Sequence, residues 1–497
     1  MRPIRAFALA LLLAIAGAGL AQPVVVMQSA DAATLDPTMN RETPTFNVLI
    51  NVFDALLTKR ADGDYGPGLA ASWEVSDDGT VWDMRLRDDV TFHDGTPFTS
   101  EAVVFTVQRI LDEATESPIR GGFTFIESVE ATGEHAVRIT TAQPTPLAEH
   151  YFSELLIVPP HVIEAEGAEA FGRAPVGTGP YRVTEWQRDV VLRLEAYQDH
   201  WRGAPDVAEV EFRPVPEAIT RVSALQAGEA DLVTQVPPNL APVLESAPSV
   251  ELAPVAGARA IYVGINVTGG HEALANPNVR RALNLAIDVE GIIEGILAGR
   301  ATPTTTFLTE VDFGYSDAVS PYAYDLDRAR ELLAEAGWDE GLELTLQSPN
   351  GRYVGDAQVA QAVAEQLQQV GVDVNLEIRE YGAYVGDLFS GNAPDLYLIG
   401  WGNAPLDADF ILYPLLRTGE LLSYYSDPEL DELLDEGRST VDRQERRAAY
   451  ADALSRIDAQ APAIFLYKPQ DLYGVSARLD WEPRTDERIW LYDAALE

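Results

Sequence analysis

A Gly-Trp-Gly turn is the part of the sequence most able to hold a small molecule. Residues 396–399 are apolar and predict a short strand, which runs into Gly400-Trp401-Gly402. The turn presents a flat aromatic face, and two acids, Asp407 and Asp409, follow in the next loop. A stacking surface with a few aimed polar groups is typical of a ligand cleft. Trp401 could instead pack in the hydrophobic core beside the glycine turn.

The polar residues around this turn have distinct expected roles. Asp407 could hold a ligand amine, whereas we expect Asp409 to cap a helix that begins near Phe410. Arg352 lies in a polar loop and could form two parallel hydrogen bonds to a ligand carboxylate. Its alternatives are a solvated loop charge or a salt bridge between two parts of the fold.

Other candidate ligand contacts lie in loops and at strand ends, and each has a structural alternative. For the Gly-Thr-Gly-Pro-Tyr segment that begins at Gly177, we favour a structural turn. The strand near 261–266 could line a cleft or only support a hinge. The full set of further candidates is Asn350, Tyr353, Thr178, Gly179, Tyr262, Asn266 and Thr43.

Catalytic and metal-binding patterns are absent from the sequence. The six histidines are scattered, and His271-Glu272 lacks the second histidine of a zinc-protease helix. There is no Gly-x-Ser-x-Gly elbow, no nucleotide P-loop and no cysteine. We therefore predict no metal and no cofactor, and a binding protein rather than an enzyme. A secreted hydrolase acting on peptides or glycosides is the alternative function.

The start of the chain has the features of an export signal. Arg2 and Arg5 precede an apolar run at 6–20, and Gly19-Leu20-Ala21 offers small residues for cleavage. The run is shorter than the roughly 20 residues of a membrane span. We therefore predict a signal peptide at 1–21 and, without a cysteine for a lipid, a freely diffusing periplasmic protein. A net charge of −43 excludes nucleic acid as a favoured partner and fits solubility in salty surroundings.

Predicted strands and helices alternate along the rest of the chain, which indicates an α/β fold. Helices are expected at 46–57 and 100–111, with Ser100 as the cap of the second, and a hairpin at 73–86. Later helices are expected to start at Asn276, Asp325 and Asp356. Two segments, at 255–266 and 463–467, have the pattern of crossings between lobes, and paired crossings make a hinge. The predicted domains are a signal peptide at 1–21, lobe I at 22–258 plus 468–497 with a subdomain at about 60–175, and lobe II at 259–467.

Five fragments along the chain form a pattern through their order and spacing. They are 31–37 (Asp-Ala-Ala-Thr-Leu-Asp-Pro), 90–99 (Val-Thr-Phe-His-Asp-Gly-Thr-Pro-Phe-Thr), 175–181 (Pro-Val-Gly-Thr-Gly-Pro-Tyr), 278–283 (Asn-Val-Arg-Arg-Ala-Leu) and Gly400-Trp401. On these fragments, the chain resembles the family 5 extracytoplasmic solute-binding proteins of ABC transporters, a group with peptide, glutathione and nickel binders. The resemblance implies a type II periplasmic binding fold with two discontinuous lobes and an extra subdomain on lobe I. It also implies a ligand enclosed by lobe closure and delivered to an ABC permease in the inner membrane.

One position departs from the pattern of the peptide binders in this family. They typically carry an aspartate three residues after the tryptophan, which pairs with the α-ammonium of the peptide, and here that position is Ala404. Enclosing an ammonium without a carboxylate costs several kcal/mol. Either Asp407 or another acid replaces it, or the ligand has no anchored amine. The residues around Asp407 and Arg352 are more similar to the glutathione binders, so we expect a monomer that binds a short peptide or a glutathione-like solute.

Overall fold

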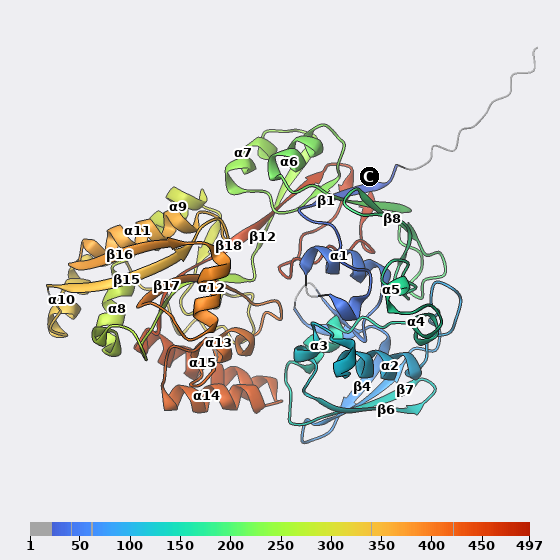
Figure 1. Ribbon diagram of the computed structural model, residues 1–497, viewed down its shortest axis with the longest axis horizontal. Coiled ribbons are helices and arrows are strands. Elements are labelled where there is room, and N and C mark those ends of the chain that lie inside the picture. The colour runs from blue at the N-terminus through green and yellow to red at the C-terminus, as the bar shows by residue number, and fades with distance from the viewer. Residues whose placement is uncertain (1–21, 41, 61–62, 339, 421) are drawn as a thin grey trace, which may run out of the picture.

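One long strand joins the two halves of the molecule. In the computed structural model, which describes residues 22–40, 42–60, 63–338, 340–420 and 422–497, β18 (Ala463–Ser476) runs from one lobe into the other (Figure 1). Its first part pairs with β13 (Arg259–Ile265) and its second part with β12 (Val250–Ala256). Because β12 and β13 are consecutive, the chain crosses between the lobes twice at one place. The predicted signal peptide lies outside the described residues, and the predicted domain limits stay predictions.

Lobe II is an α/β layer whose sheet follows the order β16-β15-β17-β13-β18. β15 pairs in parallel with β16 and β17, and β13 runs antiparallel to β17. Its strands are β13, β14 (Ala301–Pro303), β15 (Leu342–Pro349), β16 (Val372–Arg379) and β17 (Leu396–Gly402), and its helices are α8 (Pro277–Leu285), α9 (Val289–Leu297), α10 (Leu326–Glu335), α11 (Asp356–Gln368), α12 (Tyr381–Phe389), α13 (Ala408–Leu416), α14 (Pro428–Ser439) and α15 (Arg443–Gln460).

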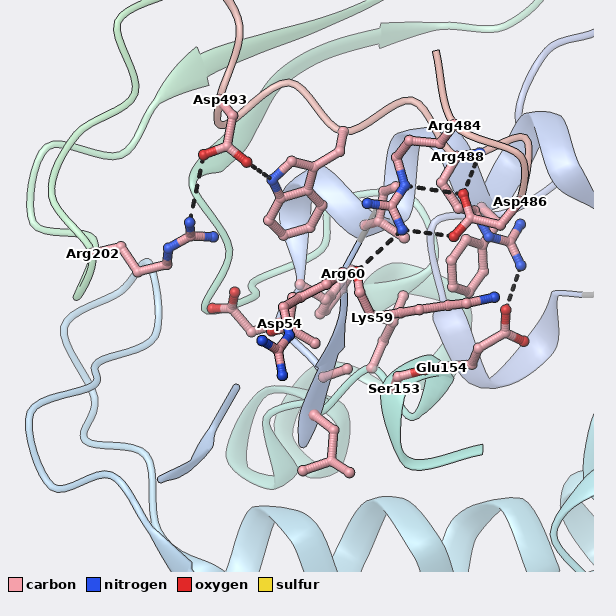
Figure 2. A pocket seen from close by; sticks show the side chains of 18 residues that line it. Asp54, Lys59, Arg60, Ser153, Glu154, Arg202, Arg484, Asp486, Arg488 and Asp493 are labelled. Atoms are coloured by element: carbon pink, nitrogen blue, oxygen red, sulfur yellow. Dashed lines mark hydrogen bonds and ion pairs between the residues drawn. The ribbon is translucent and has the colours of Figure 1, made fainter. Parts of the chain in front are cut away.

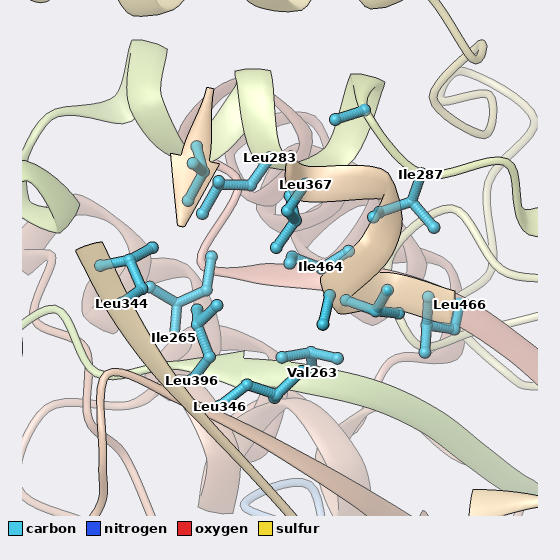
Figure 3. Close-up of a cluster of buried hydrophobic side chains, with 14 of the residues drawn as sticks. Val263, Ile265, Leu283, Ile287, Leu344, Leu346, Leu367, Leu396, Ile464 and Leu466 are labelled. Carbon is cyan, nitrogen blue, oxygen red and sulfur yellow. The ribbon is translucent and has the colours of Figure 1, made fainter. Parts of the chain in front are cut away.

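The lobe II core is built from the apolar stripes that the sequence predicts. Leu283 from α8 and Leu367 from α11 lie over Val263, Leu346 and Ile464 of the sheet (Figure 3). All five side chains are buried, and burying each one stabilises the fold by about 1.5–3 kcal/mol. This core makes the sheet a rigid support for the loops at its edges.

Lobe I continues the same sheet path through β18-β11-β1-β10-β9-β8. Its strands are β1 (Val24–Gln28), β2 (Leu57–Lys59), β3 (Tyr65–Pro67), β8 (Tyr181–Gln187), β9 (Val191–Ala196), β10 (Glu209–Pro214), β11 (Leu232–Val233), β12, β19 (Leu479–Asp480) and β20 (Ala495–Leu496), and its helices are α1 (Thr43–Val52), α6 (Ala218–Gln226) and α7 (Ala241–Glu245).

A second sheet with its own core forms a subdomain beside lobe I. Its four strands follow the order β4-β5-β7-β6, and the core includes Trp82 and Phe152, which meet edge to face. Its elements are β4 (Ala70–Val75), β5 (Val81–Leu86), β6 (Ile126–Gly133), β7 (Ala136–Thr141), α2 (Ser100–Leu111) and α3 (Ala148–Glu154). The helices α4 (Pro160–Glu166) and α5 (Ala168–Phe171) follow, and their buried side chains pack in the lobe I core.

Several predicted element ends are wrong, for identifiable reasons. The helix expected at 46–57 is α1, which starts earlier because Pro44 suits a first helical turn, and Leu57 already belongs to β2. Thr99 rather than Ser100 precedes α2, because the Ser100 hydroxyl donates to the Gly133 carbonyl oxygen instead. The caps expected at Asn276 and Asp325 are confirmed, since each side chain accepts a hydrogen bond from the first helical turn.

Candidate functional site

The carboxyl ends of three parallel strands meet at one edge of the lobe II sheet. β15, β16 and β17 all end there, and β18 leaves lobe II at the same edge because it runs antiparallel to β13. This edge therefore faces the crossings and lobe I. Loops after the carboxyl ends of such strands are where α/β folds place their ligands. The Trp401 turn and the 350–353 loop are two of these loops.

Trp401 is half-buried on the end of β17. Its indole nitrogen donates a hydrogen bond of 3.0 Å to the Phe410 carbonyl oxygen, and its ring packs on the lobe II core. Gly400 is required beside it, because a Cβ atom there would lie 2.6 Å from Ile261 and 2.8 Å from the Tyr353 ring. The indole is thus held in one orientation with part of its surface free.

The loop that carries Arg352 is held by the carboxylate of Asp356. A helix was expected to start at Asp356 with this residue as its cap; α11 does begin there, but Gly355 occupies the cap position. Its two oxygens accept hydrogen bonds from the backbone nitrogens of Gly351 (2.9 Å), Arg352 (2.8 Å) and Tyr353 (3.1 Å). Asp356 therefore sets the loop geometry, and the Tyr353 hydroxyl adds a hydrogen bond of 3.2 Å to Gly400 O.

Arg352 lies exposed against two aromatic rings. Its guanidinium carbon is 5.3 Å from the Tyr353 ring centre and 5.2 Å from the Tyr381 ring centre. Such contacts orient a guanidinium group without using its N–H donors. A cavity of about 540 Å³ beside it is lined by Asn350, Arg352 and Tyr381 among others. The arrangement can offer two parallel hydrogen bonds to a carboxylate.

Asp407 and Asp409 are both engaged by arginines. Asp407 makes two hydrogen bonds of 2.6 Å with Arg446, and its side chain caps α13 by accepting from the Asp409 nitrogen. Asp409 makes two hydrogen bonds of 2.9 Å with Arg438. The expectation that Asp409 caps the helix is therefore wrong. An amine at Asp407 would have to compete with a buried guanidinium group.

Thr178 and Gly179 pack the lobe I core. The Thr178 hydroxyl is fully buried and accepts a hydrogen bond of 3.3 Å from the Asp54 nitrogen. A Cβ atom at Gly179 would lie only 2.5 Å from the Val52 carbonyl carbon, so the glycine allows the chain to pass close to the end of α1. Thr43 is the first residue of that helix. These contacts agree with the structural role that we favoured for the Gly-Thr-Gly-Pro-Tyr segment.

Tyr262 and Asn266 lie inside lobe II. The Tyr262 ring is buried and meets Phe307 edge to face at 4.9 Å. The Asn266 amide donates to the Ala393 carbonyl oxygen and its oxygen accepts from the Gly269 nitrogen. Both side chains support the sheet, and neither lines a cavity described below.

The lobes touch, and cavities remain between them. Lys59 of lobe I donates a hydrogen bond of 2.7 Å to Ala404 O, and Arg443 of lobe II pairs with Asp64 at 3.0 Å. A cavity of about 510 Å³ between the lobes is lined by Tyr65 and His150 on one side and by Phe313, Leu406, Asp407 and Arg446 on the other. Burial lowers the pKa of His150 to about 4, so its imidazole is neutral at pH 7. This cavity and the strand-end loops form the candidate cleft.

A charged pocket of about 300 Å³ in lobe I adjoins this cleft at Lys59. Arg484 pairs with Asp486 at 2.7 Å and Arg488 with Glu154 at 2.5 Å. Figure 2 shows the Lys59 side chain running between these two pairs. Burial alone would raise the pKa of Asp486, but Arg484 holds it down to about 2. Sequence reasoning missed this pocket, and its only available signal was that Lys59 is one of two lysines in the chain.

The described residues hold no group of three or more His, Cys, Asp or Glu side chains that could bind a metal ion. In the same ranges, no helix combines the length and apolar character needed to cross a membrane.

Comparison with known proteins identifies the family. Residues 64–421 match the model of bacterial extracellular solute-binding proteins, family 5. The chain is 30% identical over 459 residues to the glutathione-binding protein GsiB of Pectobacterium atrosepticum, covering 90% of this chain and 88% of that one. HbpA2 from Haemophilus parasuis has a TM-score of 0.90 at 24% identity, over 96% of this chain and all of that one. The periplasmic binding protein DppA from Helicobacter pylori, solved with the peptide STSA, has a TM-score of 0.76 at 26% identity, over 96% and 98% of the two chains.

These likenesses extend over nearly the whole described chain and agree with the predicted two-lobe α/β architecture. Since the family model and the relatives are those of solute-binding proteins, they support a binding role and not the hydrolase alternative. The chain belongs to the family 5 solute-binding proteins of ABC transporters, with the type II periplasmic binding fold.

Proposed function

We propose that this protein is the periplasmic component of an ABC importer, which captures a short peptide or a glutathione-like solute between its lobes. It then delivers the solute, chemically unaltered, to a permease in the inner membrane. Two of the relatives named above support this class of solute, since GsiB is a glutathione-binding protein and DppA was solved with a peptide. We further propose that the protein is exported by the signal peptide at 1–21, works as a monomer and has no catalytic activity of its own.

The observation that carries the proposal is the position of the Trp401 turn and the Arg352 loop. Both lie at the strand ends that face lobe I, and Asp356 and Gly400 hold them there. A solute on this edge would touch lobe I when the lobes close. A ligand that contacts both lobes binds the closed state better and so shifts the population toward it.

Within the cleft, we propose that Trp401 covers the solute and that Arg352 binds a carboxylate of it. Asn350 and Tyr353 share the Arg352 loop and are expected to contribute polar contacts. Asp407 is poorly suited to bind an amine of the solute because it already pairs with Arg446. An amine that displaced Arg446 would leave a buried guanidinium group without its counter-charge. We therefore infer that an amine of the solute, where it has one, is held by an acid other than Asp407.

Native mass spectrometry of the purified protein, followed by calorimetry, tests the proposal. We expect a co-purifying small solute, released with an unchanged mass after incubation, and micromolar or tighter binding of glutathione or of di- to pentapeptides. Turnover of the bound peptide, or binding of none of these compounds, would contradict it.

A further inference from the structure

Asp471 is a carboxylate without a partner at the hinge. It lies on β18, opposite Val255 of β12. The residue keeps some exposed surface, but its Oδ2 atom is buried and accepts no hydrogen bond within the described residues. Two other buried acids each have a cation: Asp312 pairs with Lys468, and Asp231 with Arg478. A buried carboxyl group is paired, hydrogen-bonded or protonated, so the Oδ2 atom of Asp471 is open to a cationic partner from outside the chain.

The position of Asp471 places it next to the candidate cleft. A Cβ atom on Gly257, in the turn between β12 and β13, would lie 3.3 Å from Asp471 Oδ2 and 2.3 Å from the Pro469 carbonyl oxygen. The carboxylate thus faces the turn where the chain crosses between the lobes. Two residues on, the Arg259 guanidinium donates to Gly400 O at 3.3 Å, beside Trp401. The turn at 257–259 therefore has Asp471 on one side and the Trp401 turn on the other.

A second acid acts on Asp471 through its charge. Burial, and then the neighbouring Glu487 carboxylate, raise the pKa of Asp471 to about 7, while Arg259 opposes the shift. Near neutral pH the Asp471 carboxyl is thus close to half protonated when no cation is bound. An ammonium group placed against the Oδ2 atom would favour the carboxylate and would supply the N–H donor that this atom lacks.

We propose that Asp471, supported by Glu487, receives an ammonium group of the solute at the hinge end of the cleft, so that the protein selects solutes with a free amine. The inference rests on the proposed function, since it assigns one end of the same solute. Asp471 would then do the work of the aspartate that the peptide binders carry at the position of Ala404. Because Asp471 lies on one crossing strand and faces the turn of the other, an amine bound there touches both segments that must bend when the lobes move.

Calorimetry with matched probes tests this assignment. The probes are glutathione, Ala-Ala-Ala and their N-acetylated forms, measured with the wild-type protein, Asp471→Asn and the control Asp480→Asn, an exposed acid on β19. We expect N-acetylation to weaken binding to the wild-type protein and to the control at least tenfold. Asp471→Asn should weaken binding of the free amines at least tenfold and remove the difference between free and acetylated probes. Glu487→Gln should give a smaller loss, about threefold.

The outcomes separate this inference from the proposed function. Equal binding of free and acetylated probes to the wild-type protein overturns the inference and leaves the proposed function standing. The same holds if Asp471→Asn, shown by thermal melting to be folded, keeps the discrimination of the wild-type protein. Binding of none of the four probes to the wild-type protein contradicts the proposed function and the inference together.

Discussion

The Lys59 ammonium group donates a hydrogen bond of 2.7 Å to the Ala404 carbonyl oxygen, and this contact joins lobe I to the loop after Trp401. Burial lowers the pKa of Lys59, while the Asp486 and Glu154 carboxylates act in the opposite direction. One of the two lysine side chains of this acidic chain therefore lies at the boundary between the lobes. It is well placed to hold the closed state.

Replacing Lys59 tests this role in closure. Lys59→Met keeps the length of the side chain but removes the hydrogen bond to Ala404. Because a hydrogen bond to a charged group contributes about 1.5–3 kcal/mol, and part of this is offset by hydration in the open state, we expect affinity for peptide or glutathione to fall about threefold to tenfold. Calorimetry measures the loss. An affinity equal to that of the wild-type protein would show that the contact does not stabilise closure.

Replacing Trp401 tests the covering surface of the cleft. Trp401→Ala should weaken solute binding by about 1–3 kcal/mol, as for a buried aromatic anchor. Trp401→Phe is the matched control, since it keeps a flat aromatic ring but removes the hydrogen bond to Phe410 and part of the ring surface. It should lose less than the alanine variant. Fluorescence or calorimetric titration of a folded Trp401→Ala protein that binds as tightly as the wild type would rule the role out.

Arg352 should act on a carboxylate of the solute. Arg352→Ala should weaken binding of Ala-Ala-Ala about tenfold or more and should affect its C-terminal amide much less. Arg352→Lys should recover only part of the loss, because an ammonium group cannot make two parallel hydrogen bonds. Equal losses for the acid and the amide in calorimetry would count against a carboxylate contact.

Asp407 should matter for stability more than for binding. Asp407→Asn leaves Arg446 buried without its counter-charge, while the asparagine side chain can still cap α13, so we expect a loss of about 3–5 kcal/mol in the free energy of unfolding from the broken ion pair. Denaturant unfolding measures this loss. A variant of wild-type stability that no longer binds peptides would instead identify Asp407 as an amine ligand.

The same residues show which parts of the fold and of the site could be predicted from the sequence alone. Periodicity and caps predicted the helices α8, α10 and α11 of lobe II, because Leu283, Leu367 and their neighbours recur at the spacing of one buried face. The Trp401 turn was found because it follows a predicted strand, and the Arg352 loop because it is polar and precedes a predicted helix. Their position on one edge facing lobe I needed the parallel register of β15, β16 and β17.

What could not be predicted were contacts between residues far apart in the chain. Asp407 and Asp409 were candidates for an amine and a cap, but Arg446 and Arg438 reach them from other helices. Lys59 and Ala404 are 345 residues apart, so nothing local indicated their contact. In a chain with 78 acidic residues, only a folded structure can distinguish the unpaired carboxylate of Asp471 from the paired ones.

Small-angle X-ray scattering of the wild-type protein, alone and saturated with a solute whose binding calorimetry has established, tests the central claim most directly. Capture between two lobes that close about β12, β13 and β18 predicts a smaller radius of gyration in the presence of the solute. An unchanged scattering profile with the solute bound would contradict the account.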